Sequence, residues 1–424
     1  MNPLARLRRL LLPGHDEAQE LLVRTARQYA KHATEAQLRE SALATQVADL
    51  SDAVSRLAGQ AETSQKRLVQ LHQAMHVQRD GFLRAWRTAG PALQYQTEQW
   101  RIAERLDRLR RSSRPVLVGP WTGEVGFELL YWIPFVTWAV AAGRLDRERL
   151  VVVSRGGTRL WYEHLTPHYI DALELFPAEN YRQRTADVRK PGAWRPFDRE
   201  VVRAVRARLG QSRLDLLHPL QMGRLFQPVW RQRVALTGLD EYTAYTRFQR
   251  PAPLPWQAEL PDDYIAVKFY FSRQFPDTAD NRRFAARVVG GLARHGDVVI
   301  LGSGIKLDDH DDWQLPAQGR IHTLDRHLSP ASNLDTQTRA IAGARAFVGS
   351  YGGFSYLAPC YGVPSLSFYA DRDGFLPYHL EHAQRVFNRR GGAHFTALET
   401  RDAALVDSLL GEWGEGGAEP AART

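Results

Sequence analysis

The chain has 424 residues, 44% of them hydrophobic, and a formal net charge of +9. This length exceeds what one hydrophobic core usually organises, so we expect more than one domain. The single cysteine, Cys360, excludes an internal disulfide, and its place on an apolar helix face predicts a buried thiol. No secretory signal or membrane-length apolar run is visible, which favours a cytoplasmic protein.

The positive charge favours acidic partners, such as nucleotide diphosphates, anionic glycans or a phospholipid surface. The arginines are scattered, without the interleaved basic and aromatic residues of a single-strand binding groove, so we expect no nucleic-acid partner.

Residues 1–112 are predicted to form a helical, coiled-coil region. Apolar or small residues recur there at alternating spacings of four and three, from Leu22 through Leu43 and Leu71 to Phe82. Such a heptad seam predicts a long helix that pairs with another helix, and self-association into a homo-oligomer is the simplest form of it. The alternative is a helical hairpin that turns at Gly59 or Gly81 and packs on the enzyme.

Two further features belong to this region. Met1–Leu12 alternates leucines with arginines, a pattern that fits either peripheral contact with the inner membrane face or a frayed, solvated helix. Gly90-Pro91 is predicted to interrupt the helix, and Arg101–Arg114 to form a separate basic helix before the catalytic part begins.

Residues 113–255 are predicted to form a first Rossmann-like domain, which would bind the acceptor. Arg114–Val118 is a strand, Gly119–Gly126 a glycine-bounded loop, Phe127–Ala142 an apolar helix bent at Pro134, and Leu150–Val153 the next strand.

Residues 256–410 are predicted to form a second Rossmann-like domain, followed by a disordered tail at 411–424. It contains the predicted strand Tyr264–Lys268, a polar loop over 269–280, the helix Asn281–His295 and the strand Asp297–Gly304. The run Ala346–Asp371 then spells strand, glycine turn, short helix, turn and strand. In doubly wound sheets ligands bind at the carboxyl ends of the strands, so this turn is a candidate cradle for an anionic ligand. The alternative is that its glycines only permit tight packing of helix on sheet.

The cradle resembles that of the C-terminal donor-binding domain of GT-B glycosyltransferases, most closely the heptosyltransferase-like branch. The family pattern Gly-x-Asp-Ser-Gly-x-x-His-x-Ala is matched at Gly349, Gly353 and Ala358. The chain departs from it at Tyr351, Gly352 and Tyr356, which stand where the family has aspartate, serine and histidine. The resemblance covers about the last third of the chain. The departures at three contact residues argue against a heptose as the donor sugar.

The resemblance implies a metal-independent glycosyltransferase with no cofactor, a nucleotide-sugar donor and a cell-surface glycan acceptor. In the family, a cation after the first strand of this domain holds the donor diphosphate. The donor site it implies here comprises Lys268, Arg273, Gly302, Ser303, Gly304, Ser350, Tyr351, Gly352, Gly353, Phe354 and Ser355.

The first loop of the N-terminal domain in this family reads Gly-Asp-Val and holds the acid that deprotonates the acceptor hydroxyl. Gly123-Glu124-Val125 is similar to it, which makes Glu124 the candidate general base and Glu128 the reserve. A carboxylate at the start of a helix also stabilises the positive helix end without any catalytic role. Gly123, His218 and Arg224 are the candidates on the acceptor side, and helix and turn structure is the alternative role of His218 and Arg224.

No metal site is expected. The residues Asp308, Asp309, His310, Asp311 and Asp312 form an acidic cluster without the spacing of a calcium loop, which predicts a solvated turn. Two alternatives to glycosyl transfer remain: a polysaccharide pyruvyltransferase, which uses phosphoenolpyruvate, and an inactive coiled-coil scaffold with a glycosyltransferase-like domain.

Overall fold

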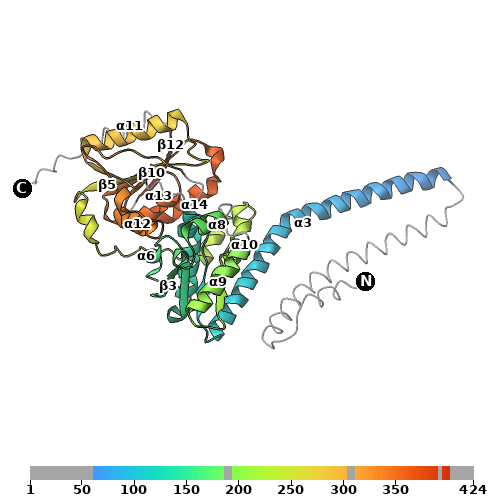
Figure 1. The fold of residues 1–424 in the computed structure, drawn as a ribbon. Coiled ribbons are helices and arrows are strands. Elements are labelled where there is room, and N and C mark those ends of the chain that lie inside the picture. Colours follow the sequence, from blue (N-terminus) through green and yellow to red (C-terminus); the bar gives the residue numbers. More distant parts are fainter. Residues whose placement is uncertain (1–60, 186–192, 303–310, 390–393, 402–424) are drawn as a thin grey trace, which may run out of the picture. The chain divides into compact units, whose positions relative to one another are not determined.

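The chain divides into two units, Met1–Thr88 and Ala89–Thr424, and one helix belongs to both. The computed structural model describes residues 61–185, 193–302, 311–389 and 394–401, with the backbone alone for 61–70 and 82–88. Helix α3, Ala61–Arg111, spans the boundary between the units and runs from blue to cyan in Figure 1. None of the described helices combines the length and the apolar character that a membrane span requires.

Helix α3 continues through Pro91, so the predicted interruption at Gly90-Pro91 is wrong. Past the proline, Ile102, Leu106 and Leu109 are buried, and the Tyr95 hydroxyl donates to the carbonyl of Gly238 at 2.7 Å. A proline removes one helical hydrogen bond, and the burial of this apolar face offsets that loss.

The predicted coiled coil is not tested by the structure. Most of its seam lies on residues 22–60, outside the described part of the chain. Within the described part, Met75 of the seam is 59% exposed and Val77 beside it is 66% exposed.

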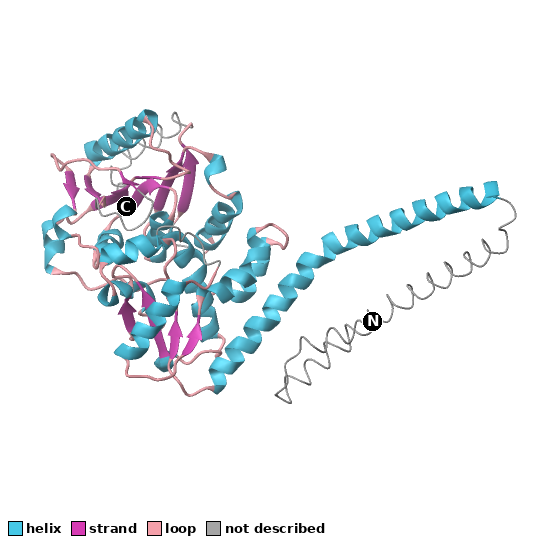
Figure 2. Ribbon diagram, turned by 45° about the vertical axis from the view of Figure 1, so that its right-hand side comes forward, coloured by secondary structure: helices cyan, strands magenta, loops and turns pink. Residues whose placement is uncertain are grey.

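The unit Ala89–Thr424 is built on two parallel sheets, seen in magenta in Figure 2. The first has the strand order β3-β2-β1-β4 and the second β12-β11-β10-β5-β7-β9. A short antiparallel pair joins β6 and β8. The strands are β1 Val116–Val118, β2 Leu150–Ser154, β3 Tyr169–Asp171, β4 Asp215–Leu217, β5 Tyr264–Lys268, β6 Tyr270–Phe271, β7 Asp297–Ile300, β8 Asp311–Asp312, β9 Ile321–Thr323, β10 Ala346–Ser350, β11 Ser365–Tyr369 and β12 Phe395–Glu399.

Helices and helical turns connect these strands. The α-helices after α3 are α4 Val125–Phe127, α5 Ile133–Ala141, α6 Arg159–Tyr162, α7 Ala172–Leu175, α8 Ala178–Thr185, α9 Pro196–Arg208, α10 Pro219–Trp230, α11 Ala279–His295, α12 Asn333–Gly343, α13 Gly353–Cys360 and α14 Pro377–Asn388. The turn η1, Glu128–Trp132, is a π-helix, and the 3₁₀ turns are η2 Arg147–Arg149, η3 Leu236–Tyr242, η4 Pro255–Glu259, η5 Asp325–His327 and η6 Arg372–Gly374. The apolar helix predicted over Phe127–Ala142 is therefore a run of α4, η1 and α5, and Pro134 lies in the first turn of α5.

Each sheet is covered on both faces, because successive residues of its buried strands belong to different core clusters. In the six-stranded sheet, Ile265 and Val267 pack with Phe284 and Val288 of α11. Tyr264 and Ala266 of the same strand belong to the core on the other face, with residues of α12 and α13. In keeping with this period of two, α11 lies on one side of the sheet in Figure 1, and α12, α13 and α14 lie on the other.

The strand order fixes where the two sheets offer a binding edge. In the first sheet the chain runs outward from β1 to β3 and then returns to place β4 on the other side of β1. In the second it runs from β5 to β9 and returns to place β10 beside β5. Such reversals open a crevice at the carboxyl ends of the strands on either side of the switch. The loops after β1, β5 and β10 are therefore where a ligand is expected.

Candidate functional site

The loops that follow β1 and β10 contact one another through two glycines. A Cβ built on Gly353, at the start of α13, would lie 2.7 Å from Val125 Cγ1 and 2.8 Å from the Gly126 nitrogen. A Cβ built on Gly126 would lie 3.5 Å from the Cα of Gly353. The starts of α4 and α13, one from each sheet, thus meet at backbone contact distance.

Because of this contact, the candidate base is the sequence neighbour of a residue that packs on the cradle. Glu124 is the N-cap residue of α4, with φ −62° and ψ 146°, and its side chain makes no capping hydrogen bond. Its neighbour Val125 is the residue that packs on Gly353. The sequence placed these two segments in different domains, and the structure joins them.

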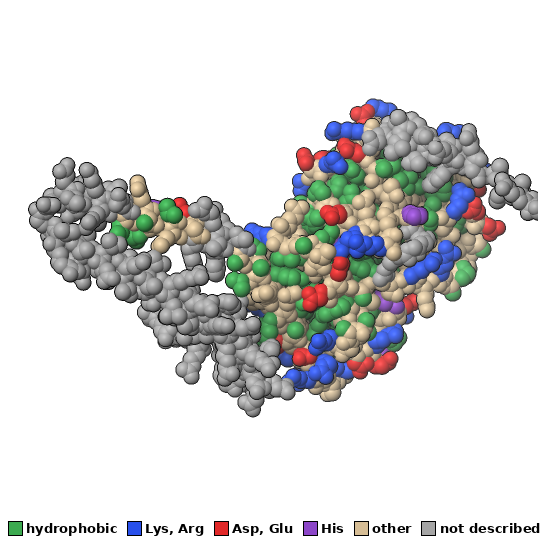
Figure 3. All heavy atoms as spheres, turned by 180° about the vertical axis from the view of Figure 1, so that it is seen from behind, with side chains coloured by type: hydrophobic (Ala, Val, Ile, Leu, Met, Phe, Trp, Pro, Cys, Tyr) green, Lys and Arg blue, Asp and Glu red, His purple; other side chains and the backbone are tan. Residues whose placement is uncertain are grey.

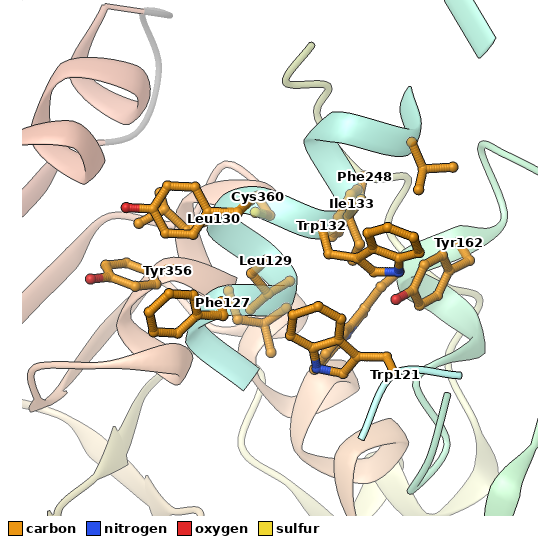
Figure 4. Packing of buried hydrophobic residues seen from close by; sticks show 14 of the residues in the cluster. Trp121, Phe127, Leu129, Leu130, Trp132, Ile133, Tyr162, Phe248, Tyr356 and Cys360 are labelled. Carbon is orange, nitrogen blue, oxygen red and sulfur yellow. The ribbon is translucent and has the colours of Figure 1, made fainter. Parts of the chain in front are cut away.

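A continuous apolar core lies behind the contact. Phe127, Leu129 and Leu130, which follow Glu124 along the chain, belong to the same buried cluster as Tyr356 and Cys360 of α13. Figure 4 shows these side chains together, with the helix of the first sheet lying against α13. Cys360 is 7% exposed, which confirms the predicted buried thiol.

The reserve base, Glu128, is a fully buried carboxylate with hydrogen-bond donors of its own. The hydroxyls of Ser154 and Tyr162 each donate to Oε1 at 2.6 Å, and the guanidinium of Arg155 pairs with Oε2. Burial and this carboxylate raise the pKa of Tyr162 well above its usual value. Burial alone would lower the pKa of Arg155, but Glu128 together with Tyr181 and Tyr162 raises that pKa above its usual value. Glu128 therefore has a structural role as one half of a buried ion pair.

The glycines of the cradle contact the protein itself. A Cβ on Gly349 would lie 2.0 Å from the carbonyl oxygen of Lys268, and one on Gly352, whose φ is +151°, would lie 1.8 Å from the Tyr270 hydroxyl. At these two positions and at Gly353, close packing is a sufficient reason for glycine, whether or not a ligand binds there. The donor contacts assigned to them stay predictions.

The polar side chains of the cradle are hydrogen-bonded to one another and to its backbone. The Tyr356 hydroxyl donates to that of Tyr351 at 2.7 Å, so two residues that depart from the family pattern form a buried pair. Ser355 Oγ donates to the Gly352 carbonyl at 2.6 Å. Ser350 Oγ accepts from the Tyr270 nitrogen at 2.9 Å. Burial, before any other cause, raises the pKa of both tyrosines, so they are neutral hydroxyls at physiological pH.

Lys268, the predicted cation for the diphosphate, lies at the end of β5 and is 4% exposed. Its ammonium is 2.9 Å from the Asp312 carboxylate and 4.7 Å from the ring centroid of Phe354 in the cradle. Asp311 and Asp312 form β8 against β6, so the prediction of a solvated turn is wrong for this part of the acidic cluster. Asp308, Asp309 and His310 lie outside the described residues. The buried ammonium attracts a carboxylate because burying the charge alone is costly.

The remaining donor-side candidates come from two stretches of the chain. Arg273 is exposed, and its carbonyl carbon would lie 2.6 Å from a Cβ built on Gly374. Gly302 is buried and packs on the carbonyl of Trp313. Ser303 and Gly304 lie outside the described residues.

On the acceptor side, His218 is the N-cap residue of α10, as its structural alternative predicted. Its Nδ1 accepts from the Leu220 nitrogen at 3.1 Å, and its Nε2 lies 3.4 Å from Asp198. Arg224 is an exposed residue of α10. The carbonyl of Gly123 accepts from Trp121 Nε1 at 3.1 Å and from Arg155 Nη2 at 2.7 Å. In the part of the chain that the structure describes, no group of three or more His, Cys, Asp or Glu could hold a metal ion.

Sequence reasoning missed a cluster in which α14 packs on η1. The ring of Tyr131 stacks on that of His382 with centroids 5.5 Å apart, and its hydroxyl is hydrogen-bonded to His379. His382 Nε2 lies 2.7 Å from the Tyr245 hydroxyl, which also donates to the Leu130 carbonyl. Histidines on the apolar side of an amphipathic helix were the available signal, but a sequence does not name their partners.

A Gly353→Ala substitution should reduce the free energy of unfolding by about 1–3 kcal/mol, because the new methyl group meets Val125 and backbone atoms of Gly126. Urea unfolding followed by tryptophan fluorescence measures this. The matched control is Gly290→Ala inside α11, where a Cβ meets nothing within 4 Å and a gain of about 0.5–1 kcal/mol is expected. Equal effects of the two substitutions would refute the tight contact.

Stability should fall as the pH drops from about 7 to 5. Burial and Arg385 lower the pKa of His382 to about 3, and burial and Arg147 lower that of His164 to about 4. Below the unfolded-state value of about 6.5, the unfolded chain takes up protons that the native state refuses, which costs up to about 1.4 kcal/mol per pH unit for each histidine. Urea unfolding at several pH values measures the slope of the unfolding free energy against pH, and His382→Gln should reduce this slope by about half of the contribution of the two histidines. A wild-type slope in His382→Gln would contradict this assignment.

No family model and no curated protein matches the sequence. Among solved structures, the chain is similar to the iron-containing dodecameric glycosyltransferase TibC from enterotoxigenic E. coli, with 14% identity over 60% of this chain and a TM-score of 0.33. It spans only 58% of the length of TibC. The ADP-heptose LPS heptosyltransferase II of E. coli matches with 12% identity over 70% of this chain and 99% of its own, with a TM-score of 0.38.

A putative UDP-N-acetylglucosamine 2-epimerase from Listeria monocytogenes also matches, with 11% identity over 73% of this chain and 93% of its own, and a TM-score of 0.32. Heptosyltransferases are thus among the matches, as the resemblance in the cradle implies. All three TM-scores lie below 0.5, so we rest no conclusion about function on them.

Proposed function

We propose that the chain is a GT-B-type glycosyltransferase that moves a sugar from a nucleotide-sugar donor to a hydroxyl of a cell-surface glycan, without a metal ion. The observation that carries this proposal is the contact between the Gly123–Gly126 loop after β1 and the start of α13 after β10. Both loops follow strands at the switch point of their sheet, where ligands of such folds bind.

Each part of the site has a role in this reaction. Glu124 accepts the proton that the attacking hydroxyl loses as the nucleoside diphosphate departs. The start of α13 offers the positive end of a helix dipole to the diphosphate, and the exposed Arg273 offers a guanidinium. Lys268 is paired with Asp312, and its ammonium packs on the ring of Phe354 in the cradle.

The rest of the chain gives this enzyme its partners. Self-association through the helical region would make it a homo-oligomer. The net charge of +9 supports contact with an anionic glycan or with the inner membrane face where such acceptors are assembled. On the face shown in Figure 3, Lys and Arg side chains are interspersed with Asp and Glu.

One observation favours a second candidate, the inactive scaffold. Lys268 is paired with Asp312, and Tyr351 is bonded to Tyr356, so these polar groups already have protein partners. A scaffold of this kind would keep the fold and bind no donor.

A thermal-shift panel separates the candidates, because a ligand that binds only the native state raises the unfolding midpoint. We expect at least one of the UDP, GDP, ADP or CMP sugars to raise the midpoint, and phosphoenolpyruvate to leave it unchanged. A shift with phosphoenolpyruvate alone would favour a pyruvyltransferase. No shift with any of them would favour the scaffold.

A further inference from the structure

Arg155 joins a buried carboxylate to the loop that carries the candidate base. It follows β2 and is 8% exposed. One terminal nitrogen of its guanidinium pairs with Glu128, and the other donates to the carbonyl of Gly123 at 2.7 Å. We propose that Arg155 is a positioning residue, which sets the place of Glu124 relative to the cradle; this inference rests on the proposed function.

The Glu128 end of this link is fixed in the core. Glu128 has no exposed surface, and two hydroxyls and the guanidinium donate to it. It is the first residue of the π-helix η1, a local widening of the helix that is frequent at functional sites. A buried carboxylate with this many donors has little freedom to move, so it provides a fixed point.

The loop end of the link is a backbone carbonyl next to the base. Backbone hydrogen bonds from Gly119 to Leu217 and from Trp121 to Val153 hold the start of the loop, whereas Gly123 has no side chain that could fix the part beside Glu124. Trp121 and Arg155 both donate to the Gly123 carbonyl, which belongs to the peptide bond that joins Gly123 to Glu124. A displacement of about 1 Å in a catalytic group can cost about 10²-fold in rate.

Arginine suits this task, and lysine does not. The guanidinium presents its donors in a rigid fork, which holds the carboxylate and the carbonyl at once. An ammonium keeps the charge that Glu128 requires but lacks the planar fork. Arg155→Lys should therefore preserve much of the ion pair and loosen the loop.

The test compares Arg155→Lys with Tyr162→Phe. Tyr162 also donates to Glu128, but it is Arg155 that donates to Gly123, so Tyr162→Phe weakens the carboxylate network and leaves the link to the loop in place. The readouts are hydrogen exchange of the amides of residues 122–126 and steady-state kinetics with the nucleotide sugar that gives the largest thermal shift.

For Arg155→Lys we expect exchange of these amides to be at least about tenfold faster, and kcat to fall by about 10²-fold with the donor KM within about twofold. Tyr162→Phe should leave loop exchange within about twofold of wild type. Should Arg155→Lys not fold, the double variant Arg155→Gln/Glu128→Gln removes both charges and replaces it, with the same expected results.

Equal loop exchange in the two variants, or an unchanged kcat in Arg155→Lys, would overturn the positioning role. A wild-type protein that turns over no nucleotide sugar would instead refute the proposed function. Arg155 would then have no reaction in which to position a base. The two failures are thus distinguishable.

Discussion

A Glu124→Gln variant should turn over its nucleotide sugar about 10²–10⁴-fold more slowly than the wild type, because the amide cannot accept the proton of the attacking hydroxyl. The substitution preserves the shape of the side chain, so the free energy of unfolding should stay within about 0.5 kcal/mol. Steady-state kinetics and urea unfolding measure the two quantities, and calorimetry should find donor affinity unchanged.

The matched control for this variant is Glu179→Gln, which changes a glutamate on the exposed side of α8. It should leave turnover and donor affinity at wild-type values. An unchanged rate in Glu124→Gln would end the assignment of Glu124 as the base. A fall in rate that follows a fall in donor affinity would make Glu124 a binding residue instead.

Glu128→Gln should have the larger effect on stability, with a loss of about 3–5 kcal/mol in the free energy of unfolding. The variant leaves the buried guanidinium of Arg155 with two neutral acceptors, the Gly123 carbonyl and Ser154 Oγ. An uncompensated buried charge is the main cost of such a substitution. Urea unfolding with unchanged slope against denaturant would show that stability, rather than the compactness of either state, has changed.

The double variant Glu128→Gln/Arg155→Gln is the control for this prediction. Removing both charges should recover much of the loss, because the cost comes from the unpaired partner. A loss below about 1 kcal/mol in Glu128→Gln alone would contradict the buried ion pair. Glu124→Gln should therefore lower turnover with little change in stability, whereas Glu128→Gln should lower stability.

The strands of the second sheet were the most predictable part of the fold. Tyr264–Lys268 has the predicted bounds, because it is a short, mainly apolar run that a polar segment follows. The cradle was found by the same reasoning, since Gly349, Gly352 and Gly353 stand between an apolar strand and an apolar helix. Local pattern is sufficient where the element is buried on both faces.

The prediction of a helix break at Gly90-Pro91 was wrong because it considered only local propensity and not packing against the rest of the fold. Proline and glycine disfavour helix, and α3 nevertheless continues, since Ile102, Leu106 and Leu109 bury its face beyond the proline. Packing energy of this kind is invisible in a window of sequence.

The partners of the charged residues were also beyond the sequence. Lys268 is paired with Asp312, 44 residues away, and Glu128 with Arg155, 27 residues away. Both lysine and glutamate fit the chemistry of a glycosyltransferase, so residue type alone does not decide whether their role is catalytic or structural. Burial decides between function and structure, and it depends on how distant elements pack.

The most direct test of the central claim is hydrogen exchange of the wild-type protein with and without each nucleotide sugar of the panel. If the donor binds where the starts of α4 and α13 meet, at least one sugar should slow exchange in both the 119–126 loop and the 349–355 cradle. Exchange that stays unchanged in both segments at saturating concentrations of every sugar, or slows only elsewhere, would contradict the account.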